Sequence, residues 1–225
     1  MESIKEMKIQ GAIFDLDGTL VDSLMFWDMG WRRIGEKYLN DGSFRPDPAT
    51  DKAVRTTHLL EAMTIVHQNC GIAESGEELC NFVEGLIVDF YTNVVKVKQG
   101  VFEFLEHLSQ KGVKMCVASA TSSNLVWLAM KSTGIDKYFD KVFSCSELGK
   151  GKECPDVYIA AHEYLGTPKD STWVFEDSVL ALETAVKAGF HTVGIYDKYN
   201  FAHDRISEMA DFFIDNGETL KKLIE

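Results

Sequence analysis

The chain has few features of a membrane, secreted or nucleic-acid-binding protein. Residues 1–8 are mixed in charge and contain no long apolar core, so we expect neither a signal peptide nor a membrane span. The 23 basic residues are outnumbered by 35 acidic ones, and the resulting net charge of −12 repels nucleic acid and anionic membrane surfaces. These absences predict a cytoplasmic protein that binds neither nucleic acid nor a membrane.

The cysteines and histidines lack the spacings that zinc sites use. The five cysteines are odd in number and stand at positions 70, 80, 116, 145 and 154, without the short paired intervals of structural zinc sites. The six histidines form no close pair of the H-E-x-x-H kind. We therefore predict reduced thiols and histidines without a metal-binding role.

The most informative string runs from Ile13 to Ser23, where two acidic residues one apart follow an apolar run. The run predicts a buried strand, so Asp15 and Asp17 should lie at its C-terminal end, where open α/β sheets bind ligands. Gly18 permits a sharp turn directly afterwards. One carboxylate there can hold a hard cation and attack phosphorus, while the second transfers a proton. A bare D-x-D also occurs at ordinary strand-to-turn junctions, but the complete DLDGT string is far less common by chance.

This string resembles the first motif of the haloacid dehalogenase-like hydrolase superfamily, and three further motifs follow in the family's order. Ser119 ends an apolar run over residues 113–118 and matches the second motif. Lys152 precedes a Pro-Asp-Val-Tyr helix start, as the third motif requires. Glu176 and Asp177 end the run Trp-Val-Phe and match the acidic fourth motif. The four motifs cover most of the chain, which makes the resemblance specific.

The resemblance implies a Mg²⁺-dependent phosphoric monoester hydrolase that works through an aspartyl-phosphate. Asp15 would be the nucleophile, and Asp17 the general acid and base. Mg²⁺ would be held by Asp15, the backbone carbonyl of Asp17 and Asp177, with Glu176 either a direct or an outer-shell partner. The phosphoryl group would be bound by Ser119 and Lys152.

Three function classes remain open at this stage. The second acidic residue, Asp17, favours phosphoryl transfer over dehalogenation, because a departing halide needs no proton donor. The preferred function is therefore a phosphatase for a small phosphorylated metabolite, with a sugar phosphate as one candidate. A sugar phosphate mutase of the β-phosphoglucomutase type carries the same four motifs and is the alternative. A noncatalytic binding module is the further alternative, which the intact set of charged motif residues disfavours.

The residue pattern after Gly100 predicts an α/β fold with a Rossmann-like parallel sheet core. Helical patterns alternate there with short apolar runs near residues 113–118, 141–145, 172–176, 191–196 and 211–214. Right-handed crossovers would bring the C-terminal ends of these strands to one edge, together with the four motifs. Residues 1–22 and 95–225 would form this catalytic core.

Residues 23–94 predict an inserted α-helical cap domain. Helical patterns cover residues 26–38, 52–69 and 77–94, and no convincing strand occurs between the first strand and residue 113. Similar family members carry a helical cap at this point, joined by two hinges, which here would be residues 20–23 and 94–100. Such a cap can exclude water and select the leaving group.

Specificity should then depend on side chains of the predicted cap. Its candidate ligand-facing residues are Phe26, Trp27, Trp31, Arg32, Arg33, Arg45, Lys52 and Arg55. Aromatic residues at helical spacing usually pack the core of their own domain, however, and basic residues usually lie on solvated faces. Arg55, which follows a predicted loop, is the one residue selected for substrate specificity.

Overall fold

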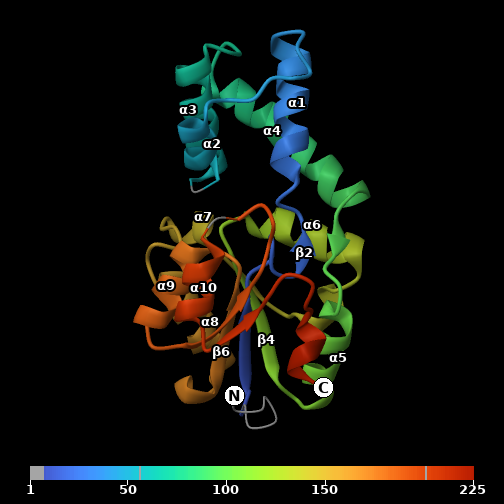
Figure 1. Cartoon of the computed structure of the whole chain (residues 1–225), viewed down its shortest axis with the longest axis vertical. Coiled ribbons are helices and arrows are strands. Elements are labelled where there is room, and N and C mark those ends of the chain that lie inside the picture. The colour runs from blue at the N-terminus through green and yellow to red at the C-terminus, as the bar shows by residue number, and fades with distance from the viewer. Residues whose placement is uncertain (1–7, 56, 201) are drawn as a thin grey trace. The chain divides into compact units, whose positions relative to one another are not determined.

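The computed structural model describes residues 8–55, 57–200 and 202–225, and the chain divides into two compact units (Figure 1). Met25–Val94 form one unit, and Met1–Leu24 together with Val95–Glu225 form the other. We call the second the core unit and the first the helical unit. In the described parts of both, every helix is too short or too polar to cross a bilayer.

The core unit is built on a six-stranded parallel sheet of order β5-β4-β1-β6-β7-β8. Its strands are β1 (Gly11–Phe14), β4 (Lys114–Ser119), β5 (Val142–Ser144), β6 (Thr172–Glu176), β7 (His191–Ile195) and β8 (Phe212–Ile214). The chain adds strands first on one side of β1 and then on the other, which makes the C-terminal end of β1 the switch point where such sheets bind ligands. The predicted Rossmann-like parallel sheet is confirmed.

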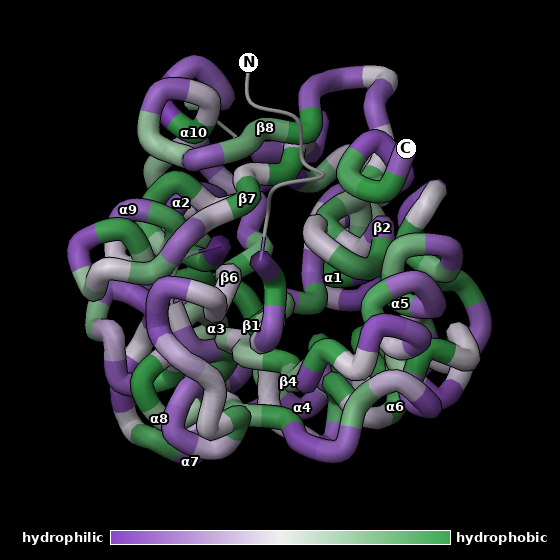
Figure 2. Tube along the Cα trace, turned by 90° about the horizontal axis from the view of Figure 1, so that it is seen from below, coloured by the Kyte–Doolittle hydropathy of each residue, from purple (hydrophilic) through white to green (hydrophobic). Residues whose placement is uncertain are grey.

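Helices cover both faces of this sheet, which explains why the inner residues of its central strands are apolar on both faces. The helices are α5 (Val101–Gln110), α6 (Ser123–Thr133), α7 (Cys145–Leu148), α8 (Asp156–Leu165), α9 (Val179–Lys187) and α10 (His203–Met209). Short 3-10 turns occupy Asp136–Tyr138, Lys169–Ser171 and Leu220–Leu223. Figure 2 shows α5 and α6 on one side of the strands and α8 and α9 on the other. A sheet covered in this way needs apolar residues on both faces.

Aromatic packing between β1, β6 and α5 anchors the strand that carries Asp15. Phe14 stacks on Phe175 with ring centroids 4.4 Å apart, and Phe104 packs against both rings. All three side chains are fully buried. Each burial contributes about 1.5–3 kcal/mol to folding, so the end of β1 is held firmly.

The prediction that no convincing strand lies between the first strand and residue 113 is wrong. β2 (Val21–Asp22) and β3 (Lys96–Val97) pair as a two-stranded antiparallel sheet. Each strand has only two residues, which is too short to produce a period-2 pattern. The pairing brings together the two segments through which the chain leaves and re-enters the core unit.

The helical unit contains α1 (Phe26–Tyr38), α2 (Pro48–Val54), α3 (Leu59–Cys70) and α4 (Gly76–Asn93). The predicted single helix over residues 52–69 is wrong, because α2 ends before α3 begins. α2 also starts earlier than expected: the Asp47 carboxylate accepts hydrogen bonds from the backbone of Ala49 and Thr50, and Pro48 occupies the first helical position. The other two predicted helices agree with α1 and α4 to within one residue.

Candidate active site

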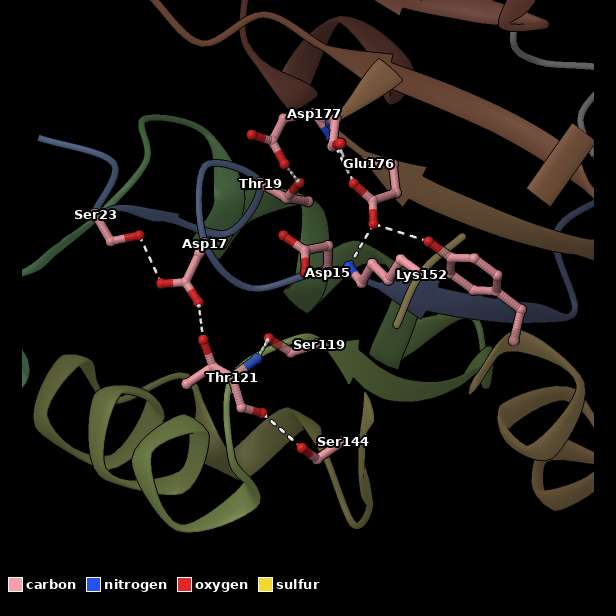
Figure 3. Close-up of polar contacts among 12 residues, drawn as sticks. Asp15, Asp17, Thr19, Ser23, Ser119, Thr121, Ser144, Lys152, Glu176 and Asp177 are labelled. Carbon is pink, nitrogen blue, oxygen red and sulfur yellow. Dashed lines mark hydrogen bonds and ion pairs between the residues drawn. The ribbon is translucent and has the colours of Figure 1, made fainter. Parts of the chain in front are cut away.

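The motif residues of the core unit lie together at the C-terminal edge of the sheet (Figure 3). Asp15 directly follows β1, Ser119 ends β4, and Glu176 ends β6 with Asp177 next to it. Lys152 comes from the segment before α8 and reaches the same point. β1 lies between β4 and β6 in the sheet, so the parallel strands deliver these groups side by side.

Lys152 joins two buried carboxylates. Its ammonium group lies 2.5 Å from Asp15 Oδ1 and also donates to Glu176 Oε1. Burial alone would lower the pKa of Lys152, but the negative charges of Asp15 and Glu176 outweigh it and hold this pKa well above the ordinary value. Lys152 is therefore a fixed positive charge beside Asp15.

Both carboxylate oxygens of Glu176 are already occupied. Oε1 accepts from Lys152 and from the Tyr158 hydroxyl, which lies 2.9 Å away. Oε2 accepts from the backbone amides of Asp177 and Ser178 at 3.1 and 3.2 Å. With four donors around two oxygens, Glu176 is saturated by the protein itself.

Asp177 is held by neutral donors instead. Its Oδ1 accepts from the Thr19 hydroxyl at 3.1 Å, and its Oδ2 accepts from the side-chain amide of Asn200. Burial, followed by the charge of Glu176, raises the pKa of Asp177 to about 7. In the described part of the chain, no basic side chain pairs directly with this carboxylate. Its ionised form is therefore unfavourable in the folded protein.

The turn at Gly18 brings the first motif against Asp177. Gly18 has a φ of +83°, and a Cβ atom placed there would lie 2.2 Å from Asp177 Oδ2. Both the backbone conformation and the close approach require glycine. The sequence analysis predicted the turn, but the contact across the site is visible only in the structure.

The three carboxylates Asp15, Glu176 and Asp177 form a group that could hold a metal ion. One oxygen of each lies within 4.8 Å of the others, and all three residues are buried. The pKa of Asp15 is raised well above its ordinary value by burial and, despite the opposing effect of Lys152, by Glu176 and Asp177. An oxygen-only donor set with uncompensated negative charge suits a hard divalent cation such as Mg²⁺.

Asp17 is turned toward hydroxyl groups. Ser23 donates to its Oδ1 at 2.7 Å and Thr121 donates to its Oδ2 at 2.8 Å (Figure 3). The Ser119 oxygen accepts from the backbone amide of Thr121 at 3.1 Å, and Ser144 donates to the Thr121 carbonyl at 2.8 Å. The hydroxyl proton of Ser119 is not used in the bond to Thr121.

The sequence analysis missed three side chains that contact Glu176 or Asp177. Thr19 and Tyr158 stand inside motif strings, in DLDGT and in Pro-Asp-Val-Tyr, and those strings were the available signal. Asn200 lies in the segment after β7, where no motif marks it. Its bond to Asp177 depends entirely on the fold.

Arg55 lies in the helical unit and is engaged within it. Its guanidinium pairs with Asp51 at 2.9 Å, and the Trp31 indole donates to the same carboxylate at 2.7 Å. The predicted role of Arg55 in substrate specificity stays a prediction.

Comparisons with known proteins relate the chain to a family of hydrolases. Residues 12–195 match the family model described as haloacid dehalogenase-like hydrolase. The chain is 26% identical over 188 residues to the phosphorylated carbohydrates phosphatase of Thermotoga maritima, covering 82% of this chain and 84% of that protein. It is 25% identical over 215 residues to the beta-phosphoglucomutase of Mycobacterium tuberculosis, covering 83% and 80% respectively. Among solved structures, CbbY from Rhodobacter sphaeroides in complex with phosphate superimposes with a TM-score of 0.77 at 18% identity, over 92% of this chain and 94% of that one.

Proposed function

The chain belongs to the haloacid dehalogenase-like hydrolase family, and on this basis we propose that it is a Mg²⁺-dependent phosphatase of a small phosphorylated metabolite. The observation that carries the proposal is the buried cluster in which Lys152 joins Asp15 and Glu176 while Asp177 lies within ligand distance. A relative that shares most of the chain is named a phosphorylated carbohydrates phosphatase, so sugar phosphates are the first substrates to test.

Asp15 is the proposed nucleophile. Its carboxylate attacks phosphorus, an acyl phosphate bond forms, and the bond between phosphorus and the ester oxygen breaks. Asp17 in its protonated form gives its proton to the departing alkoxide. The resulting Asp17 carboxylate then takes a proton from water as the water oxygen attacks phosphorus, which releases phosphate and restores Asp15.

Asp17 is oriented by two hydroxyl groups. Ser23 donates to one of its oxygens and Thr121 donates to the other. A carboxyl oxygen has two lone pairs, so it can accept such a bond and still carry or receive a proton. The two hydroxyl groups therefore hold Asp17 in place while it exchanges a proton with the leaving group and with water.

Mg²⁺ would be held by the carboxylates of Asp15 and Asp177 and by the backbone carbonyl of Asp17. We assign Glu176 to the outer shell, because its two oxygens already accept four hydrogen bonds, one of them from Lys152. When bound, the cation neutralises charge on the phosphoryl oxygens. Lys152 adds a fixed positive charge beside the nucleophile, and the Ser119 hydroxyl, whose proton is not used in its bond to Thr121, supplies a further donor.

The helical unit is proposed as the cap that selects the substrate, with Arg55 as its specificity residue. Arg55 would bind a phosphate or carboxylate of the substrate with N–H donors other than the two that it gives to Asp51. The cytoplasm is the proposed location, and five free cysteines fit a reducing compartment.

The deciding experiment incubates the purified chain with Mg²⁺ and a panel of phosphorylated sugars, nucleosides and small acids. Free phosphate and isomerised sugars are both resolved. Asp15→Asn removes the nucleophile, and Asp22→Asn is the matched control, because Asp22 is an exposed residue of β2.

We expect Mg²⁺-dependent phosphate release that Asp15→Asn abolishes and Asp22→Asn leaves intact. Interconversion of sugar phosphate isomers with little phosphate release would replace the phosphatase by the mutase reaction. Turnover that survives Asp15→Asn would refute the proposed mechanism. No turnover on any member of the panel, in a protein that binds Mg²⁺, would favour a noncatalytic role.

A further inference from the structure

Asn200 lies in the segment after β7 and touches the cluster through a single residue, Asp177. Its side-chain amide donates to the Asp177 carboxylate and, at 2.9 Å, to the main-chain carbonyl of the same residue. We propose that Asn200 is a positioning residue that orients Asp177 to bind the divalent cation. This inference rests on the function proposed above, which places a cation at Asp177.

The double contact controls the torsions of Asp177. A donor that holds both the carbonyl and the carboxylate of one residue ties the side chain to its own backbone. The Thr19 hydroxyl holds the other carboxylate oxygen. Each oxygen of the Asp177 carboxylate thus accepts from one donor, and the two hydrogen bonds restrict rotation about the bond between Cβ and Cγ. The remaining lone pairs of the carboxylate therefore keep a fixed orientation toward the cation site.

The chemistry of the contact assigns the amide orientation. In the orientation described, the NH₂ group of Asn200 meets two oxygen acceptors of Asp177. The flipped orientation would place the amide oxygen against those same two oxygens, without a donor between them. The NH₂ group must therefore face Asp177.

A neutral donor suits a residue that positions a cation ligand. Lysine or arginine at this place would neutralise Asp177 and compete with the cation for it. The amide fixes the carboxylate while leaving its full negative charge available. Glu176 differs from Asp177 in this respect. It is paired with the ammonium group of Lys152, and hydrogen bonds already occupy both of its oxygens.

The segment that carries Asn200 is itself anchored. Asp197 is buried, with 3% of its side chain exposed, and pairs with Lys98 at 2.8 Å. Its carboxylate accepts from the backbone amide of Tyr199 at 2.9 Å, and its carbonyl accepts from the backbone amide of Asn200 at 3.0 Å. Lys98 also donates to the Tyr196 carbonyl at 3.1 Å. Asn200 is thus presented from a braced turn, as a positioning residue requires.

The test measures Mg²⁺ binding directly, by calorimetric titration of the metal-free full chain. Asn200→Ala removes the donor. Asn200→Ser retains a polar side chain that is one bond shorter, and it serves as the second variant in case the alanine variant does not fold. Asn216→Ala is the matched control, since Asn216 is an exposed asparagine of the same unit. Circular dichroism and the Tm without Mg²⁺ monitor folding.

We expect both Asn200 variants to bind Mg²⁺ 10- to 100-fold more weakly, the usual cost of removing a group that orients a metal ligand. The Mg²⁺ concentration for half-maximal phosphatase activity should rise by the same factor, while kcat at saturating Mg²⁺ recovers to a large extent. Asn216→Ala should match the wild type in both respects.

Mg²⁺ affinity within twofold of the wild type in folded Asn200 variants would overturn the inference, even if their Tm fell. Weaker binding in those variants, with no phosphate released by the wild type, would leave the inference standing and refute the proposed function. A wild-type chain that binds no divalent cation would overturn both.

Discussion

The acidic cluster should make the metal-free protein less stable than a variant with one carboxylate fewer. Asp177 has a pKa of about 7 in the folded chain, against an ordinary value of 3.8. Folding therefore favours the protonated carboxyl group. The unfavourable contribution grows as the pH rises above 3.8 and levels off above about 7, where folded and unfolded chains are both ionised.

Asp177→Asn removes the negative charge but keeps the size and shape of the side chain. The amide oxygen of the new side chain can accept from Asn200, and its NH₂ group can donate to the Thr19 hydroxyl, which accepts as readily as it donates. At about 1.4 kcal/mol for each pH unit, the variant should exceed the wild type in unfolding free energy by about 2 kcal/mol at pH 5.5 and about 4 kcal/mol at pH 8.5.

The assay is urea unfolding in EDTA at several pH values, followed by tryptophan fluorescence, to which Trp127 and Trp173 of the core unit contribute. Asp140→Asn is the control at an exposed position. Its difference from the wild type in unfolding free energy should not grow with pH. Adding Mg²⁺ at about 100 times its Kd should stabilise the wild type by about 2.7 kcal/mol and leave Asp177→Asn unchanged.

The reasoning is refuted if Asp177→Asn is less stable than the wild type at pH 8.5 without metal. It is equally refuted if the difference in unfolding free energy between Asp177→Asn and the wild type does not increase between pH 5.5 and 8.5. A Mg²⁺-induced stabilisation of the same size in both proteins would show that Asp177 does not take part in cation binding.

Two further substitutions test the roles of charged motif residues. With p-nitrophenyl phosphate, Asp17→Asn should release one nitrophenolate per chain in a rapid burst, because this leaving group needs no proton. The turnover that follows the burst should be slowed about 10²- to 10⁴-fold. Stopped-flow absorbance measures both phases, and turnover at the wild-type rate would contradict the assigned role of Asp17. Lys152→Met should cost about 3–5 kcal/mol in urea unfolding at pH 8, because Asp15 and Glu176 lose their buried cation. Lys150→Met, which removes an exposed ion pair, should leave stability near that of the wild type, and equal effects of the two lysine substitutions would refute the argument.

The positions of the core strands along the chain could be predicted from the sequence because their signal is local. β4, β6 and β7 are apolar runs bounded by helical patterns, and each lies within one residue of its predicted range. The acidic and hydroxyl residues that end these runs are local features too. Parallel topology then brings the ends together, because right-handed crossovers place every C-terminal end at the same edge.

Some elements lacked a local signal of sufficient strength. β2 and β3 have two residues each and depend on pairing with each other across the whole helical unit. The break between α2 and α3 was hidden by helical patterns on both sides of it. Asp47 and Pro48, in contrast, are an ordinary helix start, although the predicted helix over residues 52–69 did not include them.

The sequence by itself determined the family and the residues of the candidate site, because Asp15, Asp17, Lys152 and the pair of Glu176 and Asp177 each belong to a short contiguous string. Only the tertiary structure decided how those groups are held. The bond from Thr19 to Asp177 spans 158 residues, and that from Lys152 to Asp15 spans 137. The saturation of Glu176 and the contact of Asn200 with Asp177 likewise depend on distances between strand ends and loops, which no local pattern of residues encodes.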